Sequence, residues 1–281
     1  MNEQTNNFQL TFPNGMKSVI DENAYKFIVE LQQQKKKTQI TLPYFWDFSN
    51  SINQYDDLFI SFYSYLLTNR KLSKSQLFQD LFVLYFFNNK KNGTFLEFGS
   101  TDGISLSNSF TLENNFQWHG VLAEPSPQWH QQLKKNRPNS TIISECIYSE
   151  TGKILDFFVS DHGELSTLIE FKNSEISSMP SNTKERNESG YNYKVKTISL
   201  NDVFVKYFNG VAIDYMSVDT EGSELIILEN FDFERFSPKI VTVEHNFTPT
   251  QDKLDKLFNE NNYTRFFREH TQFDAWYVLN E

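Results

Sequence analysis

The chain has 281 residues, 38% of them hydrophobic and 22% charged, which is enough for one large domain or one domain with an extension. Its net charge of −10 argues against broad nucleic-acid binding, because such binding needs a basic surface that neutralises phosphates. The single cysteine, Cys146, excludes an intramolecular disulfide and indicates a reducing compartment. The polar N-terminus and the lack of a long apolar run predict a cytoplasmic protein with no membrane span.

The first 72 residues show no chemical motif and predict a helical N-terminal extension. Residues 1–20 are expected to be irregular, with a turn at Pro13-Asn14-Gly15. Apolar residues at helical spacing predict helices over 21–37 and 55–70. We expect this extension to cover the main domain, to position substrate or to form a homo-oligomer.

Residues 73–281 form the predicted main domain, which begins with a capping-box pattern at Ser73-x-x-Gln76 and a helix that ends near Tyr85. The run 94–98 is short, apolar and typical of a buried strand. It leads into a turn that contains Gly99 and Gly103. Glycines in a strand-to-helix turn let the backbone come close to a ligand.

Strands and helices alternate after this turn. The predicted strands are 120–123, 141–147, 154–159, 193–198, 214–219 and 240–244, and the predicted helices begin near 106, 126, 199, 222 and 248. Residues 161–193 are polar and predict a long loop that is either a lid over the substrate or simply mobile. The chain ends with two strands, 263–267 and 273–279, which form an antiparallel hairpin.

This order predicts an α/β fold: a mostly parallel sheet with helices on both faces and a terminal antiparallel hairpin. Ligands bind such sheets at the carboxyl ends of the strands. Four predicted strands end in acids, and the residues at these ends are Glu97, Glu124, Asp219 with Glu221, and Glu244 with His245. We therefore expect one acidic site at this edge.

The spacing Glu97-x-Gly99-x-x-x-Gly103 differs from the dinucleotide pattern G-x-G-x-x-G. An acid in this turn suits a cationic ligand without phosphate, such as S-adenosylmethionine. Glu124 follows Gly103 at the distance where an acid accepts hydrogen bonds from ribose hydroxyls. Because Glu124 would serve an NAD ribose equally well, a nicotinamide-dependent oxidoreductase is an alternative. A non-catalytic binding module with the same fold is another.

Several ordered motifs extend over this domain: Ser75-Gln76-x-x-Gln79-Asp80, Phe95 to Gly103, Ser107-Asn108, Leu112-Glu113, Trp118-x-Gly120 to Pro125, Asn136-Arg137, Val218 to Glu224, and Val243 to Asn246. Through them the chain, from about Ser75 to its end, resembles the FkbM-type family of S-adenosylmethionine-dependent methyltransferases. The resemblance implies a Rossmann-like methyltransferase fold and O-methylation of a hydroxyl on a sugar, a glycan or a related small polar metabolite. It does not cover the first 70 residues.

The resemblance also implies cofactor contacts at the strand ends. We expect these contacts from Glu97, Gly99, Thr101, Asp102, Ser107, Glu124, Pro125, Glu145, Cys146 and Asp219. For Cys146, a role as a small buried hydrophobe is the simpler interpretation.

Direct in-line methyl transfer to a hydroxyl is assisted by a base that accepts its proton. His245 is the first candidate for this base and Asp219 the second, with Glu244 beside them. Alternatively, Asp219, Glu221, Glu244 and His245 share a divalent cation, because such oxygen ligands suit Mg²⁺, Ca²⁺ or Mn²⁺. Without a cation, these residues would hydrogen-bond a polar acceptor directly.

Overall fold

The computed structural model describes residues 7–11, 17–21 and 57–280, and the chain divides into two compact units, Met1–Ser73 and Lys74–Glu281. In the first unit, β1 (Asn7–Thr11) and β2 (Lys17–Asp21) form an antiparallel pair. The expectation of irregular structure is wrong at these strands, since apolar and polar residues alternate in β1 as a strand requires. The turn at residues 13–15 and nearly all of the helix over 21–37 lie outside the described residues.

The helix predicted over 55–70 is present as α2 (Asp57–Asn69). No helix among residues 57–280 is both long and apolar enough to cross a membrane.

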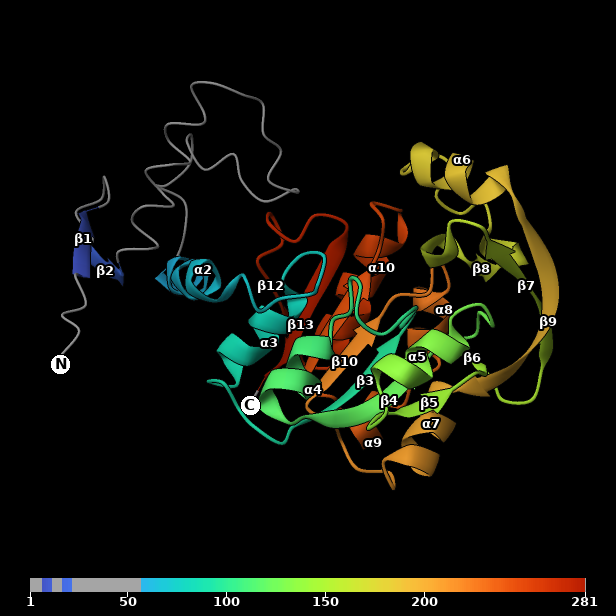
Figure 1. Ribbon diagram of the computed structural model, residues 1–281, viewed down its shortest axis with the longest axis horizontal. Coiled ribbons are helices and arrows are strands. Elements are labelled where there is room, and N and C mark those ends of the chain that lie inside the picture. Colours follow the sequence, from blue (N-terminus) through green and yellow to red (C-terminus); the bar gives the residue numbers. More distant parts are fainter. Residues whose placement is uncertain (1–6, 12–16, 22–56, 281) are drawn as a thin grey trace. The chain divides into compact units, whose positions relative to one another are not determined.

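The unit Lys74–Glu281 is built on a seven-stranded sheet with the order β12-β13-β11-β10-β3-β4-β5 (Figure 1). The strands are β3 (Thr94–Phe98), β4 (His119–Ala123), β5 (Thr141–Ile143), β10 (Tyr215–Val218), β11 (Ile240–Glu244), β12 (Tyr263–Phe266) and β13 (Asp274–Leu279). β3, β4, β5, β10 and β11 are parallel, and β13 is antiparallel to β11 and β12. The predicted α/β fold and its terminal hairpin are therefore confirmed, and the strand order reverses between β3 and β10.

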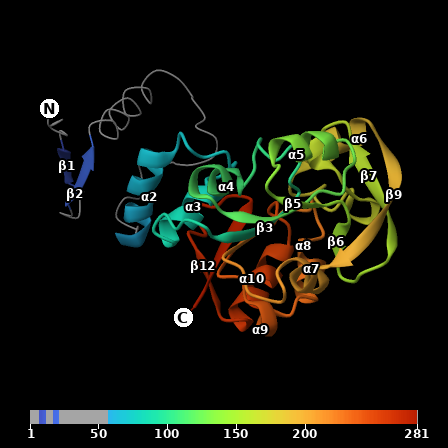
Figure 2. The ribbon, with the colours of Figure 1, turned by 60° about the horizontal axis from the view of Figure 1, so that its bottom comes forward.

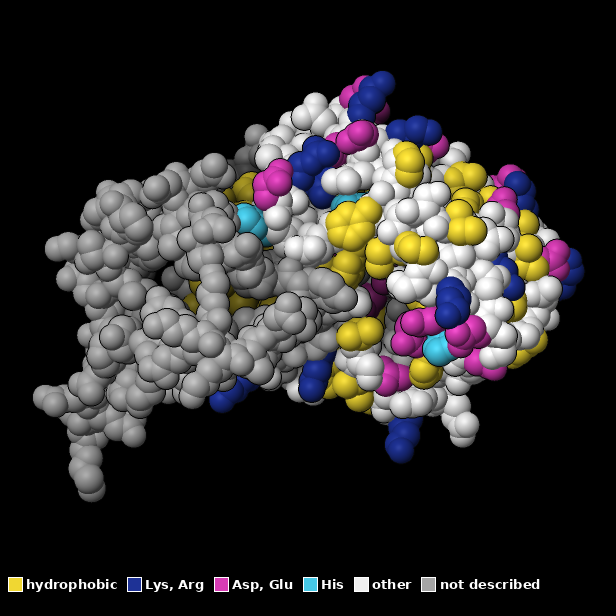
Figure 3. Space-filling model, turned by 90° about the horizontal axis from the view of Figure 1, so that it is seen from above, with side chains coloured by type: hydrophobic (Ala, Val, Ile, Leu, Met, Phe, Trp, Pro, Cys, Tyr) yellow, Lys and Arg dark blue, Asp and Glu magenta, His cyan; other side chains and the backbone are white. Residues whose placement is uncertain are grey.

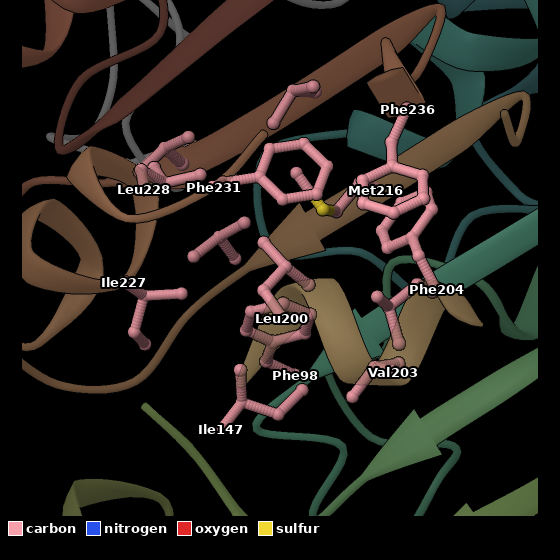
Figure 4. Close-up of a cluster of buried hydrophobic side chains, with 14 of the residues drawn as sticks. Phe98, Ile147, Leu200, Val203, Phe204, Met216, Ile227, Leu228, Phe231 and Phe236 are labelled. Atoms are coloured by element: carbon pink, nitrogen blue, oxygen red, sulfur yellow. The ribbon is translucent and has the colours of Figure 1, made fainter. Parts of the chain in front are cut away.

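Helices cover both faces of this sheet, with α4 and α5 on one side and α9 and α10 on the other (Figure 2). The helices of this unit are α3 (Gln79–Phe86), α4 (Phe110–Phe116), α5 (His130–Asn136), α6 (Pro180–Glu188), α7 (Leu200–Tyr207), α8 (Glu224–Glu229), α9 (Phe233–Phe236) and α10 (Thr250–Glu260). Under one face lies an apolar core in which Phe204, Phe231 and Phe236 pack around Met216 (Figure 4). Burying each of these phenylalanines contributes about 1.5–3 kcal/mol.

The starts of the helices differ most from the predictions. The capping box at Ser73 does not form, because α3 begins only at Gln79, and the hydroxyl of Ser75 accepts the backbone N–H of Asp80 at 3.1 Å. The helices predicted from 106 and 126 begin at 110 and 130, after tight turns. The predicted cap of α7 is confirmed, since Ser199 accepts the N–H of Asp202.

A second, smaller sheet has the order β6-β9-β7-β8. Its strands are β6 (Cys146–Tyr148), β7 (Ile154–Ser160), β8 (Thr167–Leu168) and β9 (Gly190–Ser199). The predicted strand 141–147 is thus two strands, β5 and β6, which belong to different sheets.

The polar segment 161–193 is not an irregular loop. It contains short 3₁₀ turns, β8, α6 and the start of β9. The buried Arg186 of α6 stabilises it by donating to the carbonyl oxygens of Leu165 at 2.8 Å and Lys172 at 3.3 Å. A role as a lid over the substrate stays a prediction.

Candidate active site

A cavity of about 240 Å³ opens at the carboxyl edge of the main sheet, where the strand order reverses between β3 and β10. Both apolar and acidic side chains are exposed on the face seen in Figure 3. Most residues that the sequence nominated line this cavity: Glu97, Gly99, Thr101, Asp102, Ser107, Glu124, Pro125, Cys146, Asp219, Glu221 and Glu244. Glu145 and His245 do not line it.

Glu97, the last residue but one of the buried strand β3, holds the loop that precedes α4. Its carboxylate accepts the Asn108 N–H at 2.7 Å and the hydroxyls of Ser107, at 3.0 Å, and Ser109. Burial raises the pKa of Glu97, and the Arg137 charge and these donors oppose that rise. Glu97 therefore fixes the position of the loop 107–109, part of which forms the cavity wall.

Arg137, at the end of α5, lies next to this loop and is almost fully buried. It pairs with Glu113 at 2.7 Å and donates to the Ser109 hydroxyl at 2.9 Å and the Gly103 carbonyl at 3.0 Å. One guanidinium thus joins α5, α4 and the glycine turn. The sequence motif contained Arg137 but gave no reason for it.

The turn after β3 is held by its own residues. Gly99 has φ +66°, and a Cβ on it would clash with the carbonyl oxygen of Asp219 at the end of β10. The Asp102 carboxylate accepts the N–H groups of Ile104, at 2.8 Å, and Ser105, at 2.7 Å. Asp102 therefore stabilises the turn, although it also lines the cavity.

Glu124 is placed at the end of β4, as predicted. One carboxylate oxygen accepts the Thr101 N–H and the other accepts the Ser126 N–H, each at 2.8 Å. Burial raises the pKa of Glu124 to about 7, against the lowering effect of these two hydrogen bonds. Each oxygen retains a further acceptor site for the hydroxyls of a ligand.

The second sheet gives the cavity an apolar wall that the sequence did not reveal. Phe157, Leu165 and Leu168 line it together with Ile147 and Cys146. Burial raises the pKa of the Cys146 thiol to about 12, so Cys146 is a small apolar residue here. Phe157, Leu165 and Leu168 were missed because β7 and the segment 161–193 are polar or unremarkable in sequence, and only tertiary packing brings them to the site.

Acids gather at the other end of the cavity, where β10 and β11 end. Carboxylate oxygens of Asp219, Glu224 and Glu244 lie within 4.8 Å of one another. Burial and the Glu224 charge raise the pKa of Asp219 to about 8. Burial and the Asp219 charge raise the pKa of Glu244 well above its usual value. Like charges this close favour a shared proton.

The four expected cation ligands, Asp219, Glu221, Glu244 and His245, do not form one cluster, and the described acids that lie close enough to share an ion are Glu175, Glu221 and Glu244, or Asp219, Glu224 and Glu244. Arg186 donates to Glu221, and it pairs with Glu175 at 3.0 Å, so a guanidinium already compensates these two carboxylates. One oxygen of Glu224 accepts the Thr220 and Gly222 N–H groups at 2.9 and 3.0 Å. His245, the fourth expected ligand, is elsewhere.

His245 was the first candidate for the base, and its side chain contradicts that role. Its Nδ1 accepts the Phe247 N–H at 3.1 Å, and its Nε2 lies 3.3 Å from Arg265. Burial and the Arg265 charge lower the pKa of His245 to about 4. A residue at the end of a strand can turn to either side, and His245 faces β12 instead of the cavity.

Asp274, the first residue of β13, lines the acidic end and was not nominated from the sequence. It lies directly opposite Glu244 in the antiparallel pairing of β11 and β13. Because β13 runs antiparallel to β11, the first residue of β13 lies at the same edge of the sheet as the last residues of the parallel strands. The predicted antiparallel hairpin contains the signal for Asp274, because the first residue of an antiparallel strand lies at the edge where the parallel strands end.

The model of the FkbM methyltransferase domain matches residues 97–276 of the chain. No curated protein matches the chain in sequence. Among solved structures, a methyltransferase FkbM from Methylobacillus flagellatus is similar with 12% identity over 76% of this chain and 59% of that one, at a TM-score of 0.42. A putative caffeoyl-CoA O-methyltransferase from Staphylococcus aureus is similar with 14% identity over 91% and 98%, at a TM-score of 0.41.

The strand order, the terminal hairpin and the cavity over the reversal point define an S-adenosylmethionine-dependent methyltransferase of the Rossmann-like class. The chain belongs to the FkbM methyltransferase family, since that domain accounts for well over half of its length.

Proposed function

We propose that the protein is an S-adenosylmethionine-dependent O-methyltransferase that acts on a hydroxyl of a sugar, a glycan or a related small polar metabolite. The observation that supports this most is the pair of close carboxyl groups, Asp219 and Glu244, in the same cavity as Glu124. A carboxyl pair that shares one proton is able to accept another from a hydroxyl.

The composition of the cavity wall fits a cationic cofactor without phosphate. Eight Asp and Glu line the cavity, and none of the described residues that line it is Lys, Arg or His. The pyrophosphate of a nicotinamide dinucleotide would meet eight acids and no basic side chain among the described residues of this wall, which argues against the oxidoreductase alternative. Glu124 would hold the ribose hydroxyls, and the apolar wall around Phe157 would hold the adenine.

When bound, S-adenosylmethionine supplies a methyl group that its sulfonium already activates. The protein then has two tasks. Alignment of the two reactants by the cavity contributes on the order of 7–11 kcal/mol. The Asp219–Glu244 pair accepts the hydroxyl proton, which adds roughly 10²–10⁴ in rate.

Asp219→Asn and Glu244→Gln test this function. We expect turnover, measured as release of S-adenosylhomocysteine over a panel of hydroxylated sugars and glycans, to fall by about 100-fold or more. The affinity for S-adenosylhomocysteine, measured by calorimetry, should change by less than about threefold. Normal turnover in either variant would exclude the residue as the base. A wild-type protein that binds S-adenosylhomocysteine without turnover across the panel would favour the binding-module alternative.

The proposed mechanism uses no divalent cation, because the Asp219–Glu244 pair accepts the proton, and Arg186 already compensates the neighbouring Glu175 and Glu221. We expect turnover to survive treatment with excess EDTA. Loss of turnover that Mg²⁺, Ca²⁺ or Mn²⁺ restores would contradict this assignment.

Two expectations about the whole chain stay proposals. The single buried cysteine supports a cytoplasmic location. Residues 1–72 are proposed as the surface through which copies of the chain associate, and light scattering of the full chain measures the number of copies.

A further inference from the structure

Asp274 differs from the other acids at its end of the cavity in what surrounds its carboxylate. Its Oδ2 accepts the side-chain N–H groups of Gln79 at 2.9 Å and Trp276 at 2.8 Å. The backbone N–H of Ala275 is a further donor to this carboxylate. Burial raises the pKa of Asp274 to about 6, and these three donors oppose that rise because they stabilise the ionised carboxylate.

Asp219 and Glu244 have different surroundings, because each lies close to other carboxyl groups, although Glu244 also accepts the side-chain N–H of Asn246 at 2.8 Å. Asp274 stands directly across the sheet from Glu244, and opposite residues in an antiparallel pair have Cβ atoms about 4.5–5.5 Å apart on the same face. The acidic end therefore combines a proton-sharing pair with a neighbouring carboxyl group whose donors favour the ionised form.

The remaining charges around Asp274 do not cancel this difference. Arg265 approaches from β12, but it donates to the backbone carbonyl of Asp274 at 3.3 Å and pairs with Asp255 at 3.0 Å. Asp274 is only 3% exposed, so solvent screens its charge weakly. A positive centre in the cavity would interact with this carboxylate strongly.

We propose that Asp274 is a further active-site residue, whose carboxylate makes the cavity prefer a positively charged ligand centre to a neutral one. The inference rests on the proposed function. Its consequence is that the site holds the cationic methyl donor more tightly than its neutral product, which promotes product release. Gln79, from the Ser75-Gln76-x-x-Gln79-Asp80 motif, is the positioning residue for this carboxylate.

Two analogues separate this role from a structural one. S-adenosylhomocysteine is neutral at the reacting centre, whereas sinefungin has an amine there that is protonated. We expect Asp274→Asn to weaken sinefungin roughly tenfold at pH 8 while S-adenosylhomocysteine changes less than about twofold, both by calorimetry. Gln79→Met keeps the carboxyl but removes one donor, so it should shift the ratio in the same direction by less.

Asp214→Asn is the matched control, since Asp214 is also buried and accepts bonds from Lys90 and Thr94, but at the far end of β10. It should leave the ratio of the two affinities unchanged. Equal weakening of both analogues in Asp274→Asn, or an unchanged ratio in both the Asp274 and Gln79 variants, would overturn the proposal. A wild-type protein that binds neither analogue would instead overturn the proposed function.

Discussion

The two ends of the cavity contain similar acids in contrasting surroundings. At the β3–β4 end, Glu97 accepts a backbone N–H and hydroxyls with the Arg137 charge nearby, and Glu124 accepts two backbone N–H groups. At the β10–β11 end, Asp219 and Glu244 face each other. Donors stabilise charge and like charges oppose it. The first end is thus built to keep a fixed shape around a ligand, and the second to exchange a proton.

The largest effect on this comparison is expected from removing Arg137, the cation near Glu97 at the β3–β4 end. Arg137→Met removes a buried guanidinium and leaves the partly buried Glu113 and the Ser109 hydroxyl without this donor, so we expect a loss of about 3–5 kcal/mol in the free energy of unfolding, measured with urea. Lys135→Met, on the same helix but exposed, should change it by less than about 0.5 kcal/mol. Similar stability in the two variants would contradict the role given to Arg137.

The close approach of the two ends depends on Gly99. Gly99→Ala should cost about 1–3 kcal/mol more than Gly152→Ala, because only at Gly99 does a Cβ meet another backbone. Both glycines have positive φ, so the pair separates steric clash from backbone strain. Equal losses in urea unfolding would show that strain alone matters at Gly99.

The pH dependence of the free energy of unfolding tests the surroundings of Glu124, at the β3–β4 end of the cavity. Its pKa is raised from 4.5 to about 7 in the folded state, so the folded chain binds the proton more tightly than the unfolded chain. The stability from this group is complete below pH 4.5 and is lost as the pH rises through 7. Between pH 5 and 7.5 the loss is about 2 kcal/mol.

Urea unfolding without ligand at several pH values measures this loss. Glu124→Gln should reduce the loss over this range by about 2 kcal/mol and leave the part that comes from the other buried acids, whereas Glu145→Gln, at the neighbouring strand end but outside the cavity, should keep the full dependence. An unchanged slope in Glu124→Gln would assign the dependence to other groups.

The smallest expected effect is on cofactor affinity. Glu124→Gln keeps the shape of the side chain but accepts hydrogen bonds less strongly, so we expect about tenfold weaker binding of S-adenosylhomocysteine by calorimetry. Glu145→Gln should leave the affinity unchanged. Weaker binding in Glu145→Gln and unchanged binding in Glu124→Gln would contradict the role of Glu124 at the ribose and support Glu145, which the sequence predicted as a cofactor contact.

Much of the fold and several of the acids that line the site follow from sequence alone. Alternating strand and helix patterns predict a parallel sheet, and short-range rules place Glu97, Glu124, Asp219 and Glu244 at strand ends. These conclusions hold because they depend on local periodicity and on one general property of parallel sheets.

The remainder was decided by tertiary structure. His245 turns toward Arg265, Asp274 enters the site through an antiparallel strand, and the segment 161–193 folds around Arg186. Each of these outcomes depends on which distant residue supplies a donor, an acid or a packing surface. Sequence places a carboxyl group at the edge of the sheet, but its partners across the sheet determine whether it keeps its charge.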